Sequence, residues 1–379
     1  MTRHRIVTVV GTRPEVIKMA PVIREIESRR ELFKHTLVAT AQHREMLDQA
    51  LETFALKPDI DLGLMQHDQG LAEFASSSLT AVSKILRELE PDVLLIQGDT
   101  TTVMTAALAA FYLGVRVGHV EAGLRSFDRR NPFPEEINRR VASCLADIHF
   151  APTERARLNL IREGAPQERI FVTGNTIVDA LKSISIGDSF DDASLARLFS
   201  KPSRVLLVTA HRRENHGQPL RSICQALKTL VRAFEDLEIV YPVHLNPTVG
   251  AIVQEELGKT ERVHLTNPLS YADTLRVMKR CFLVMTDSGG IQEEAPSFHK
   301  PVLVLREATE RPELIEANAG RLVGTDLRRI TETATRLLTD RSEYDRMCEA
   351  ENPFGDGHAA ERIVGLLAEQ LGANHQSEL

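Results

Sequence analysis

Cysteine is scarce in this 379-residue chain and is not arranged as a ligand set or a disulfide framework. The four cysteines, Cys144, Cys224, Cys281 and Cys348, are widely separated, and no CxxC pair occurs. This spacing excludes the usual zinc motifs and a disulfide scaffold. We therefore expect reduced, buried thiols and no metal site.

Long apolar runs and an excess of basic charge are also missing. No stretch approaches the roughly 18 apolar residues of a membrane-spanning helix, and the N-terminal MTRHRIVTVVG is too short for a secretory signal. The formal net charge is -7, whereas nucleic-acid binding needs a basic surface. The sequence therefore predicts a cytoplasmic protein with neither a nucleic-acid nor a membrane partner.

What the chain does have is an alternation of short apolar runs and longer amphipathic stretches. The first series contains IVTVV, TLVATA, VLLIQ, VGHV, IHFA and IFVTG, with helix-like stretches at 14–29, 43–54, 101–113, 134–145 and 153–163. A second series begins at Arg204 with VLLVTA, IVYPV, VHLT, FLVMT and PVLVL. This rhythm is typical of βαβ units, and the length exceeds what one hydrophobic core usually serves. The sequence predicts two Rossmann-like, doubly wound parallel-sheet domains.

The domain boundary is expected in the least patterned stretch, from Ser183 to Ser203, which is polar and rich in turn-forming residues. We place an N-terminal domain carrying the acid and base residues at 1–185 and a C-terminal nucleotide-binding domain at 200–355. The turn-rich NPFGDG precedes a last helix-like segment. We expect residues 356–379 to return to the first domain.

Ligands of open α/β sheets bind beyond the carboxyl ends of the strands, so the loops there are the place to look for function. The first such loop is Gly11-Thr12-Arg13-Pro14-Glu15, with Lys18 one turn later. Arg13 and Lys18 can donate to phosphate oxygens near the free N–H groups of the helix start. The alternative is a helix start whose cations face solvent. Since GxGxxG and GxxxxGK[ST] are absent here, neither a dinucleotide nor a P-loop is indicated.

Acidic residues follow two later strands of the first series. Asp99 comes after VLLIQ, Glu121 comes after VGHV, and Glu135 and Glu136 begin the next helix-like segment. Crowded carboxylates raise one another's pKa, which keeps an acid protonated near neutral pH. The ordinary alternatives are N-capping for Asp99 and complementation of the helix dipole for Glu135 and Glu136. For Glu121 we favour function, because an acid directly after a buried strand is costly to leave unpaired.

The second series carries a histidine and two anion-binding candidates at its strand ends. His211 can act as an acid or base, and the adjacent Arg212 can bind phosphate, while His244 ends the following strand. In TDSGGIQEEA, Gly289 and Gly290 let the backbone approach a pyrophosphate. Structural roles, such as a strand-capping histidine or a helix merely capped by Ser288, remain the alternatives.

Taken together, the motifs resemble the non-hydrolysing UDP-N-acetylglucosamine 2-epimerases. The resemblance is carried by GTRPEVIKMAPV, TAQHREMLDQ, QGDTTT, GHVEAGLRS, PFPEEINRR, TGNTIVDAL, TAHRREN, VYPVHLNP, TDSGGIQEEAPS, TERPE, VGTD and NPFGDG, in this order over nearly the whole chain. It implies the GT-B fold, with two Rossmann-like domains around a deep cleft. It also implies an isomerase that interconverts UDP-GlcNAc and UDP-ManNAc through elimination of UDP and a 2-acetamidoglucal intermediate, without a cofactor.

The resemblance assigns roles to individual residues. At the reaction centre it places Asp99, Glu121, Glu135 and His211. It implies that Arg13 and His211 contact the diphosphate and that Lys18 positions the substrate. Ser288, Gly289 and Gly290 would hold the diphosphate. Glu294 would contact the ribose, Arg311 the nucleotide end, and the loop from Leu269 to Thr274 the uracil. The resemblance also implies a role in cell-envelope polysaccharide biosynthesis and a homodimer, for which helices between Leu71 and Glu88 are interface candidates.

Some bacterial relatives bind a second UDP-GlcNAc as an allosteric activator. The positions that match that regulatory site are Gln42, Gln69, Arg212 and His244. Glu45 and Asp68 stand where some members have glutamine and arginine, which leaves activation by substrate open here.

Three other functions compete with this interpretation. A hydrolysing epimerase would release UDP and free ManNAc, a GT-B glycosyltransferase would need an acceptor, and a UDP-sugar sensor would bind without chemistry. The PFPEE and TAHRREN motifs argue against the hydrolysing enzyme, and the ionisable residues at reaction positions argue against the sensor.

Overall fold

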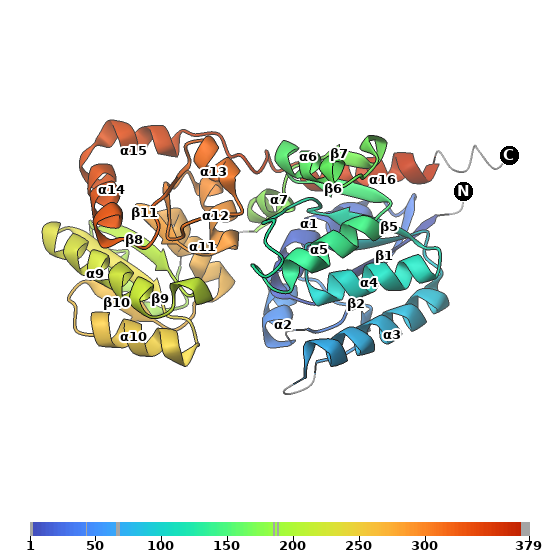
Figure 1. The fold of residues 1–379 in the computed structure, drawn as a ribbon, viewed down its shortest axis with the longest axis horizontal. Helices are drawn as coiled ribbons and strands as arrows, with labels where there is room; N and C mark the ends of the chain where they lie inside the picture. The colour runs from blue at the N-terminus through green and yellow to red at the C-terminus, as the bar shows by residue number, and fades with distance from the viewer. Residues whose placement is uncertain (1–2, 43, 66–68, 185, 188, 373–379) are drawn as a thin grey trace. The chain divides into compact units, whose positions relative to one another are not determined.

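Two parallel sheets organise the chain in a computed structural model that describes residues 3–42, 44–65, 69–184, 186–187 and 189–372 (Figure 1). Unit 1 comprises Met1–Ile184 and Phe354–Leu379, and unit 2 comprises Ser185–Pro353. In each sheet the neighbouring strands are parallel, and helices pack against both faces. The predicted fold class, two doubly wound parallel α/β domains, is therefore confirmed.

The described residues of unit 1 form a seven-stranded sheet in the order β3-β2-β1-β4-β5-β6-β7. Its strands are β1 His4–Val10, β2 Phe33–Ala39, β3 Ile60–Asp61, β4 Val93–Gln97, β5 Arg116–Val120, β6 Ile148–Ala151 and β7 Ile170–Val172. Its helices are α1 Arg13–Ser28, α2 Arg44–Thr53, α3 Leu71–Leu89, α4 Thr101–Tyr112, α5 Glu135–Leu145, α6 Glu154–Arg162, α7 Thr176–Ser183 and α16 Ala359–Gly372, with the 3-10 turn η1 Gln167–Arg169.

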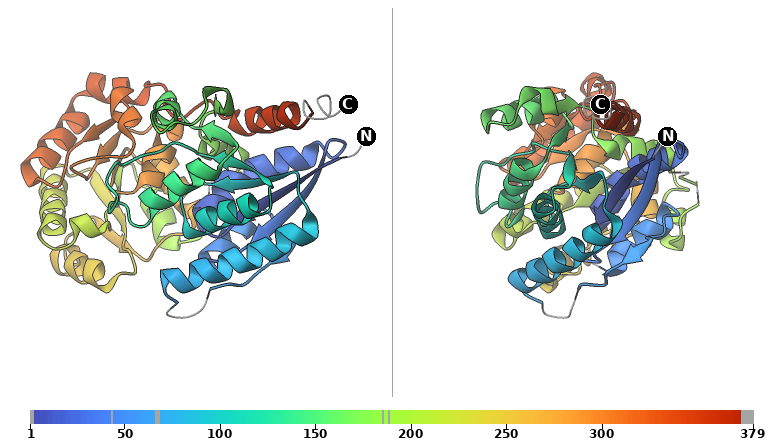
Figure 2. Two further views of the ribbon diagram at one scale, coloured as in Figure 1. Left: turned by 45° about the vertical axis from the view of Figure 1, so that its right-hand side comes forward. Right: turned by 90° about the vertical axis from the view of Figure 1, so that its right-hand side faces the viewer.

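Burial on both faces explains the continuous apolar strands of unit 1. Val7 and Val9 of β1 pack in a core with Val82 and Val103 of helices α3 and α4. Helices α1, α2, α7 and α16 form the other layer, since α1 packs against each of the remaining three. Figure 2 shows α16, the red helix at the C-terminal end, running beside the blue helix α1.

The described residues of unit 2 form a six-stranded sheet in the order β10-β9-β8-β11-β12-β13. Its strands are β8 Arg204–Thr209, β9 Leu237–Pro242, β10 Val263–Thr266, β11 Leu283–Thr286, β12 Val302–Val304 and β13 Gly320–Leu322. Its helices are α8 Ala193–Leu198, α9 Gln218–Ala233, α10 Pro247–Leu257, α11 Tyr271–Arg280, α12 Gly289–Glu294, α13 Pro312–Glu316, α14 Leu327–Thr339 and α15 Arg341–Cys348, with the 3-10 turns η2 Arg213–Asn215 and η3 Ala295–Phe298. One face of the sheet shares its apolar core with α9, α10 and α14.

Some local features differ from the sequence-based expectations. The segment from Ser183 to Ser203, expected to be irregular, contains α8, which Asp192 caps through the Ser194 N–H at 2.7 Å. Of the cysteines expected to be buried, Cys224 and Cys281 are, but Cys144 on α5 is exposed. No helix among the described residues is both long and apolar enough to cross a bilayer.

Three histidines among the described residues of unit 1 are shielded from solvent and resist protonation. Burial lowers the pKa of His35 to about 4, that of His119 to about 4 and that of His149 to about 3. Below a pH of about 6.5, the unfolded chain binds protons at these positions and the folded chain does not, so their contribution to stability is lost as pH falls towards 4. Glu15 and Asp179, whose pKa values burial raises, act in the opposite direction.

We therefore expect the free energy of unfolding of unit 1 to fall between pH 6.5 and 4, by about 1.4 kcal/mol per pH unit for each proton taken up on unfolding. Urea denaturation at a series of pH values measures this slope. His149→Leu removes one titrating group and should make the slope shallower. An unchanged slope in this variant would show that His149 is not one of the groups responsible.

Candidate active site

Each sheet reverses its strand order at one place, between β1 and β4 in unit 1 and between β8 and β11 in unit 2. Loops that leave the carboxyl ends of such strand pairs are where doubly wound sheets bind ligands. In unit 1 these loops carry Arg13 and Asp99, and in unit 2 they carry His211 and Ser288. Arg13, Asp99, His211 and Ser288 therefore lie at the switch points of their own units, and Glu121 lies on the loop after the neighbouring strand β5.

Glu121 is held in a strained, buried position directly after β5. Its backbone φ of 62° lies in the left-handed region, which is costly for a glutamate and is typical of functional sites. One carboxylate oxygen accepts from Lys18 Nζ at 2.5 Å and from Asn175 Nδ2 at 3.3 Å, and the other accepts from Gln97 Nε2. The ion pair with Lys18 compensates the charge of a carboxylate that is only 8% exposed. Lys18 thus orients Glu121 as well as adding positive charge.

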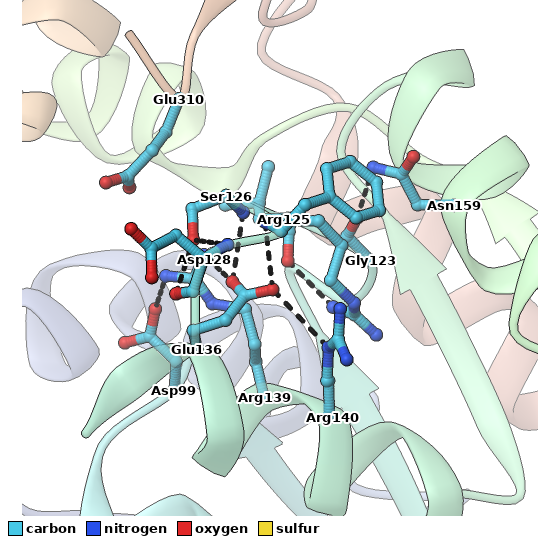
Figure 3. Close-up of polar contacts among 12 residues, drawn as sticks. Asp99, Gly123, Arg125, Ser126, Asp128, Glu136, Arg139, Arg140, Asn159 and Glu310 are labelled. Carbon is cyan, nitrogen blue, oxygen red and sulfur yellow. Dashed lines mark hydrogen bonds and ion pairs between the residues drawn. The ribbon is translucent and has the colours of Figure 1, made fainter. Parts of the chain in front are cut away.

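Asp99 is not the N-cap of the following helix, which was the ordinary alternative for it. Thr100 caps α4, its hydroxyl accepting the Val103 N–H at 3.3 Å. The Asp99 carboxylate instead accepts a hydrogen bond from Arg139 Nη2, as Figure 3 shows, and its side chain remains 28% exposed. Asp99 therefore combines a charged partner with access to solvent.

Glu135 and Glu136 have different environments although both begin α5. Glu136 is fully buried and accepts the backbone N–H groups of Ser126 and Phe127 at 2.9 and 3.1 Å, and Arg139 Nη1 at 3.2 Å (Figure 3). It therefore fixes the loop that follows Glu121 onto α5. Glu135 is only partly buried. Through Arg139, the segment that carries Glu135 is joined to Asp99.

The remaining candidates of unit 1 are less tightly bound together. Arg13, the first residue of α1, is partly exposed, and its side chain has no hydrogen bond or ion pair with another described residue. Gln42 accepts the hydroxyl of Thr102 at 2.9 Å, so its carbonyl supports the start of α4. Gln69 directly precedes Gly70, the N-cap of α3. Glu45 is exposed in the first turn of α2, and Asp68 lies outside the described residues.

In unit 2 the buried Asp287 organises the loop that carries His211. Asp287 is completely buried, and its Oδ2 accepts the backbone N–H groups of His211 and Arg212, each at 2.8 Å, and Nδ2 of Asn215 at 2.9 Å. The His211 ring stacks on the ring of His244, with centroids 4.9 Å apart and an interplanar angle of 9°. Burial lowers the pKa of His211, while the nearby Asp287 carboxylate opposes this shift. At neutral pH the ring is thus a neutral donor or acceptor.

Two arginines converge on the glycine pair after β11. A Cβ built on Gly289 would lie 3.6 Å from Nη2 of Arg212 and 3.8 Å from Nη2 of Arg311. Glu293 orients Arg311 by accepting its Nε–H at 2.5 Å. The Ser288 hydroxyl makes no capping bond to α12 among the described residues, so simple helix capping does not account for it. Arg212, Ser288, Gly289 and Arg311 together offer an anion two guanidinium groups, a hydroxyl and exposed backbone.

Glu294 is buried at the far end of α12 and accepts the hydroxyl of Tyr271 at 3.0 Å. Tyr271 is the first residue of α11, which Ser270 caps through the Asp273 N–H at 3.1 Å. The loop expected to contact uracil thus adjoins the acid expected to contact ribose. Within it, Leu269 precedes the cap, and the hydroxyl of Thr274 is bound to the Ser270 carbonyl at 2.9 Å.

Three residues of this arrangement received no role from the sequence, namely Glu15, Arg139 and Asp287. Each lies inside a motif that the sequence singled out, but its partner is distant along the chain. Glu15 accepts the Thr100 hydroxyl at 2.7 Å, and burial, with Asp99 adding to it, raises the Glu15 pKa to about 7. The signal in the sequence that could have pointed to these three residues was their charge, together with their position inside a motif that also holds functional candidates. Among the residues that the structure describes, no three histidine, cysteine, aspartate or glutamate side chains are grouped as for a metal ion.

Comparison with known proteins identifies the family to which the chain with these site residues belongs. The family model described as UDP-N-acetylglucosamine 2-epimerase matches residues 24–368. This chain belongs to the UDP-N-acetylglucosamine 2-epimerase family. It is therefore an enzyme of the isomerase class, as the sequence predicted, and the polar clusters of both units belong to an epimerase.

Individual members of the epimerase family match along nearly their full length. The UDP-N-acetylglucosamine 2-epimerase of Salmonella typhimurium is 50% identical over 370 residues, covering 96% of this chain and 98% of its own. That of Bacillus subtilis is 47% identical over 367 residues, covering 97% and 96%. The crystal structure of the Neisseria meningitidis UDP-GlcNAc 2-epimerase bound to UDP-GlcNAc matches with a TM-score of 0.88 and 42% identity, covering 96% of this chain and all of that one.

Proposed function

We propose that this protein interconverts UDP-N-acetylglucosamine and UDP-N-acetylmannosamine by eliminating UDP and adding it back. The observation that carries the proposal is the group of carboxylates beyond the strands of unit 1, with Glu121 held by Lys18 and Asp99 by Arg139. The binding of UDP-GlcNAc by the Neisseria meningitidis relative supports the choice of substrate.

The reaction needs a group that accepts a proton and a group that stabilises a leaving diphosphate. A base takes the proton from C2, the C1–O bond breaks, and its electron pair leaves with UDP, which gives 2-acetamidoglucal. Protonation at the opposite face of C2 and attack of the UDP oxygen on C1 complete the epimerisation. No atom is oxidised or reduced overall, so the route requires no redox cofactor.

Residues of both units are assigned roles in this reaction. Asp99, Glu121 and Glu135 of unit 1 are proposed to move the protons at C2, because C2 has no activating carbonyl and needs a positioned base. Arg13 is proposed to donate to the diphosphate. In unit 2, His211 and the residues around Gly289 are proposed to stabilise the departing diphosphate.

Proton NMR in D2O tests the reaction. UDP-GlcNAc incubated with the enzyme should incorporate deuterium at C2, and UDP-ManNAc signals should appear while the nucleotide sugar stays intact. Accumulation of free ManNAc would instead identify a hydrolysing epimerase. Binding without any exchange at C2 would indicate a glycosyltransferase or a sensor.

Arg212 provides a test of the diphosphate site. We expect Arg212→Ala to raise the Kd for UDP about 10- to 100-fold, since charge-assisted hydrogen bonds contribute about 1.5–3 kcal/mol. Isothermal titration calorimetry with UDP measures this. Arg328→Ala is the matched control, because Arg328 is exposed on α14 and paired only with Glu332 among the described residues.

The same variant separates the two roles that Arg212 can have. If Arg212 serves a second, regulatory substrate site, Arg212→Ala keeps wild-type affinity for UDP and changes only how the rate depends on UDP-GlcNAc concentration. That result would remove Arg212 from the diphosphate site.

A further inference from the structure

Glu15 is a buried acid that the proposed reaction does not use. It lies in the first turn of α1 and is 1% exposed. Its Oε2 accepts the backbone N–H of Gly11 at 2.6 Å, and its Oε1 accepts the hydroxyls of Thr12 at 3.0 Å and Thr100 at 2.7 Å. One carboxylate therefore binds both loops at the switch point of unit 1.

Local helix capping explains only part of this arrangement. Thr12 is the N-cap of α1 and Glu15 is three residues later, the spacing of a capping box. A capping-box acid satisfies donors near its own helix start, as Glu15 does with Gly11 and Thr12. The bond to Thr100 serves no such purpose, because Thr100 belongs to the loop after β4, 85 residues away.

The loop after β1, which Glu15 joins to the loop after β4, also passes close to threonine side chains. A Cβ on Gly11 would lie 2.4 Å from Oγ1 of Thr102 and 2.5 Å from Oγ1 of Thr40, so only glycine fits where the β1 loop passes the start of α4. A small rotation of one loop must therefore move the other. The hydrogen bonds of the Glu15 carboxylate hold the two loops in this contact.

We propose that Glu15 is a positioning residue that locks the Arg13 loop to the Asp99 loop, and thereby sets the direction of the Asp99 carboxylate. Thr12 directly precedes Arg13, and Thr100 directly follows Asp99. We call these bonds the tether: Glu15 accepts the hydroxyls of Thr12 and Thr100 and the N–H of Gly11. This inference rests on the proposed function, since it assigns Glu15 to the geometry of the same reaction.

Two substitutions separate the tether from the charge. In Glu15→Gln the amide oxygen can accept the Gly11 N–H while the NH2 group donates to the Thr12 and Thr100 hydroxyl oxygens, so the loops stay joined with reversed polarity. Glu15→Ala removes every one of these bonds. Glu25→Ala is the matched control, because Glu25 lies on the same helix, is partly exposed and is bonded to Arg29.

The kinetic test compares C2 deuterium exchange of the full-length variants. We expect Glu15→Ala to lower kcat about 30- to 100-fold, the scale of losses caused by misplaced catalytic groups. Glu15→Gln should stay within about threefold of the wild type, and so should Glu25→Ala, because neither breaks the tether. Exchange by Glu15→Ala at the wild-type rate, or a Glu15→Gln as impaired as Glu15→Ala, would overturn the proposal.

Substitutions of Thr12 and Thr100 should affect different kinetic constants, which a purely structural role of Glu15 would not produce. Thr12→Val should mainly raise KM, because Thr12 adjoins Arg13, and Thr100→Val should mainly lower kcat, with Thr100→Ser restoring it. In the Glu15→Ala background both effects should shrink, since the shared partner is already missing. Fully additive effects would show that the three residues act independently, against the proposal.

Hydrogen–deuterium exchange of the protein backbone tests the tether without relying on activity. Peptides covering residues 8–13 and 98–102 should exchange faster in Glu15→Ala than in the wild type and Glu15→Gln. If the wild-type enzyme showed no C2 exchange, the proposed function would fail while this measurement still decided the tether. Unchanged protection of both peptides in Glu15→Ala would refute the tether alone.

Discussion

Asp99→Asn is expected to fold like the wild type and to lose C2 exchange by about 10²- to 10⁴-fold, the usual contribution of a general acid or base. Asparagine has nearly the same shape, and its amide oxygen can still accept the Arg139 N–H, so α5 and the loop after β4 should keep their places. What it cannot do is take up a proton. The exchange rate at C2, followed by proton NMR in D2O, measures the loss.

Asp147→Asn is the matched control for this variant. Asp147 directly precedes β6, at the opposite, amino edge of the same sheet, where its carboxylate accepts the Val117 N–H at 2.9 Å. The same chemical change there should leave exchange unaltered. A fully active Asp99→Asn enzyme would remove Asp99 from the proton-transferring groups and leave Glu121 and Glu135 as the candidates.

Asp287→Ala is expected to have the largest effect on stability, lowering the free energy of unfolding of unit 2 by about 3 kcal/mol. The substitution leaves the N–H groups of His211 and Arg212 and the amide of Asn215 without their shared acceptor, and each buried unsatisfied group costs about 1–3 kcal/mol. Relief from burying a carboxylate offsets part of this loss. Urea denaturation provides the measurement.

Asp287→Asn separates the acceptor from the charge. Its amide oxygen replaces Oδ2, so the loop after β8 should keep most of its hydrogen bonds, and the loss of stability should be markedly smaller than in Asp287→Ala. Affinity for UDP should follow the same order, because Arg212 depends on this loop. Equal losses in both variants would show that the charge of Asp287, rather than its role as shared acceptor, supports the loop.

The apolar runs were sufficient to predict the long central strands of both sheets, because strands buried on both faces must be apolar throughout. They missed β3 and β13, which have two and three residues and lie at the sheet edges, where pairing with a neighbour replaces a sequence pattern. They also missed α8, whose start depends on one capping aspartate.

The residues of the candidate site could likewise be predicted only in part. Residues that directly follow strands, such as Asp99, Glu121 and His211, could be selected from the sequence because strand ends meet at one edge of a parallel sheet. The partners that hold these residues could not. Arg139 reaches Asp99 across 40 residues and Asp287 reaches the His211 N–H across 76, and such contacts exist only once β4 and β8 have their neighbours.

The C-terminal helix has a consequence for synthesis. α16 packs on α1 and α7. Before the helix the Asn175 N–H donates to the Phe354 carbonyl at 2.7 Å, and in its first turn the Ala360 N–H donates to Asp179 at 2.8 Å. Unit 2 is one continuous stretch, whereas unit 1 is interrupted by it. During translation the second domain can thus be completed first. The amino-terminal domain, although most of it is synthesised earlier, can complete its packing on α1 only after the residues of α16 have been synthesised.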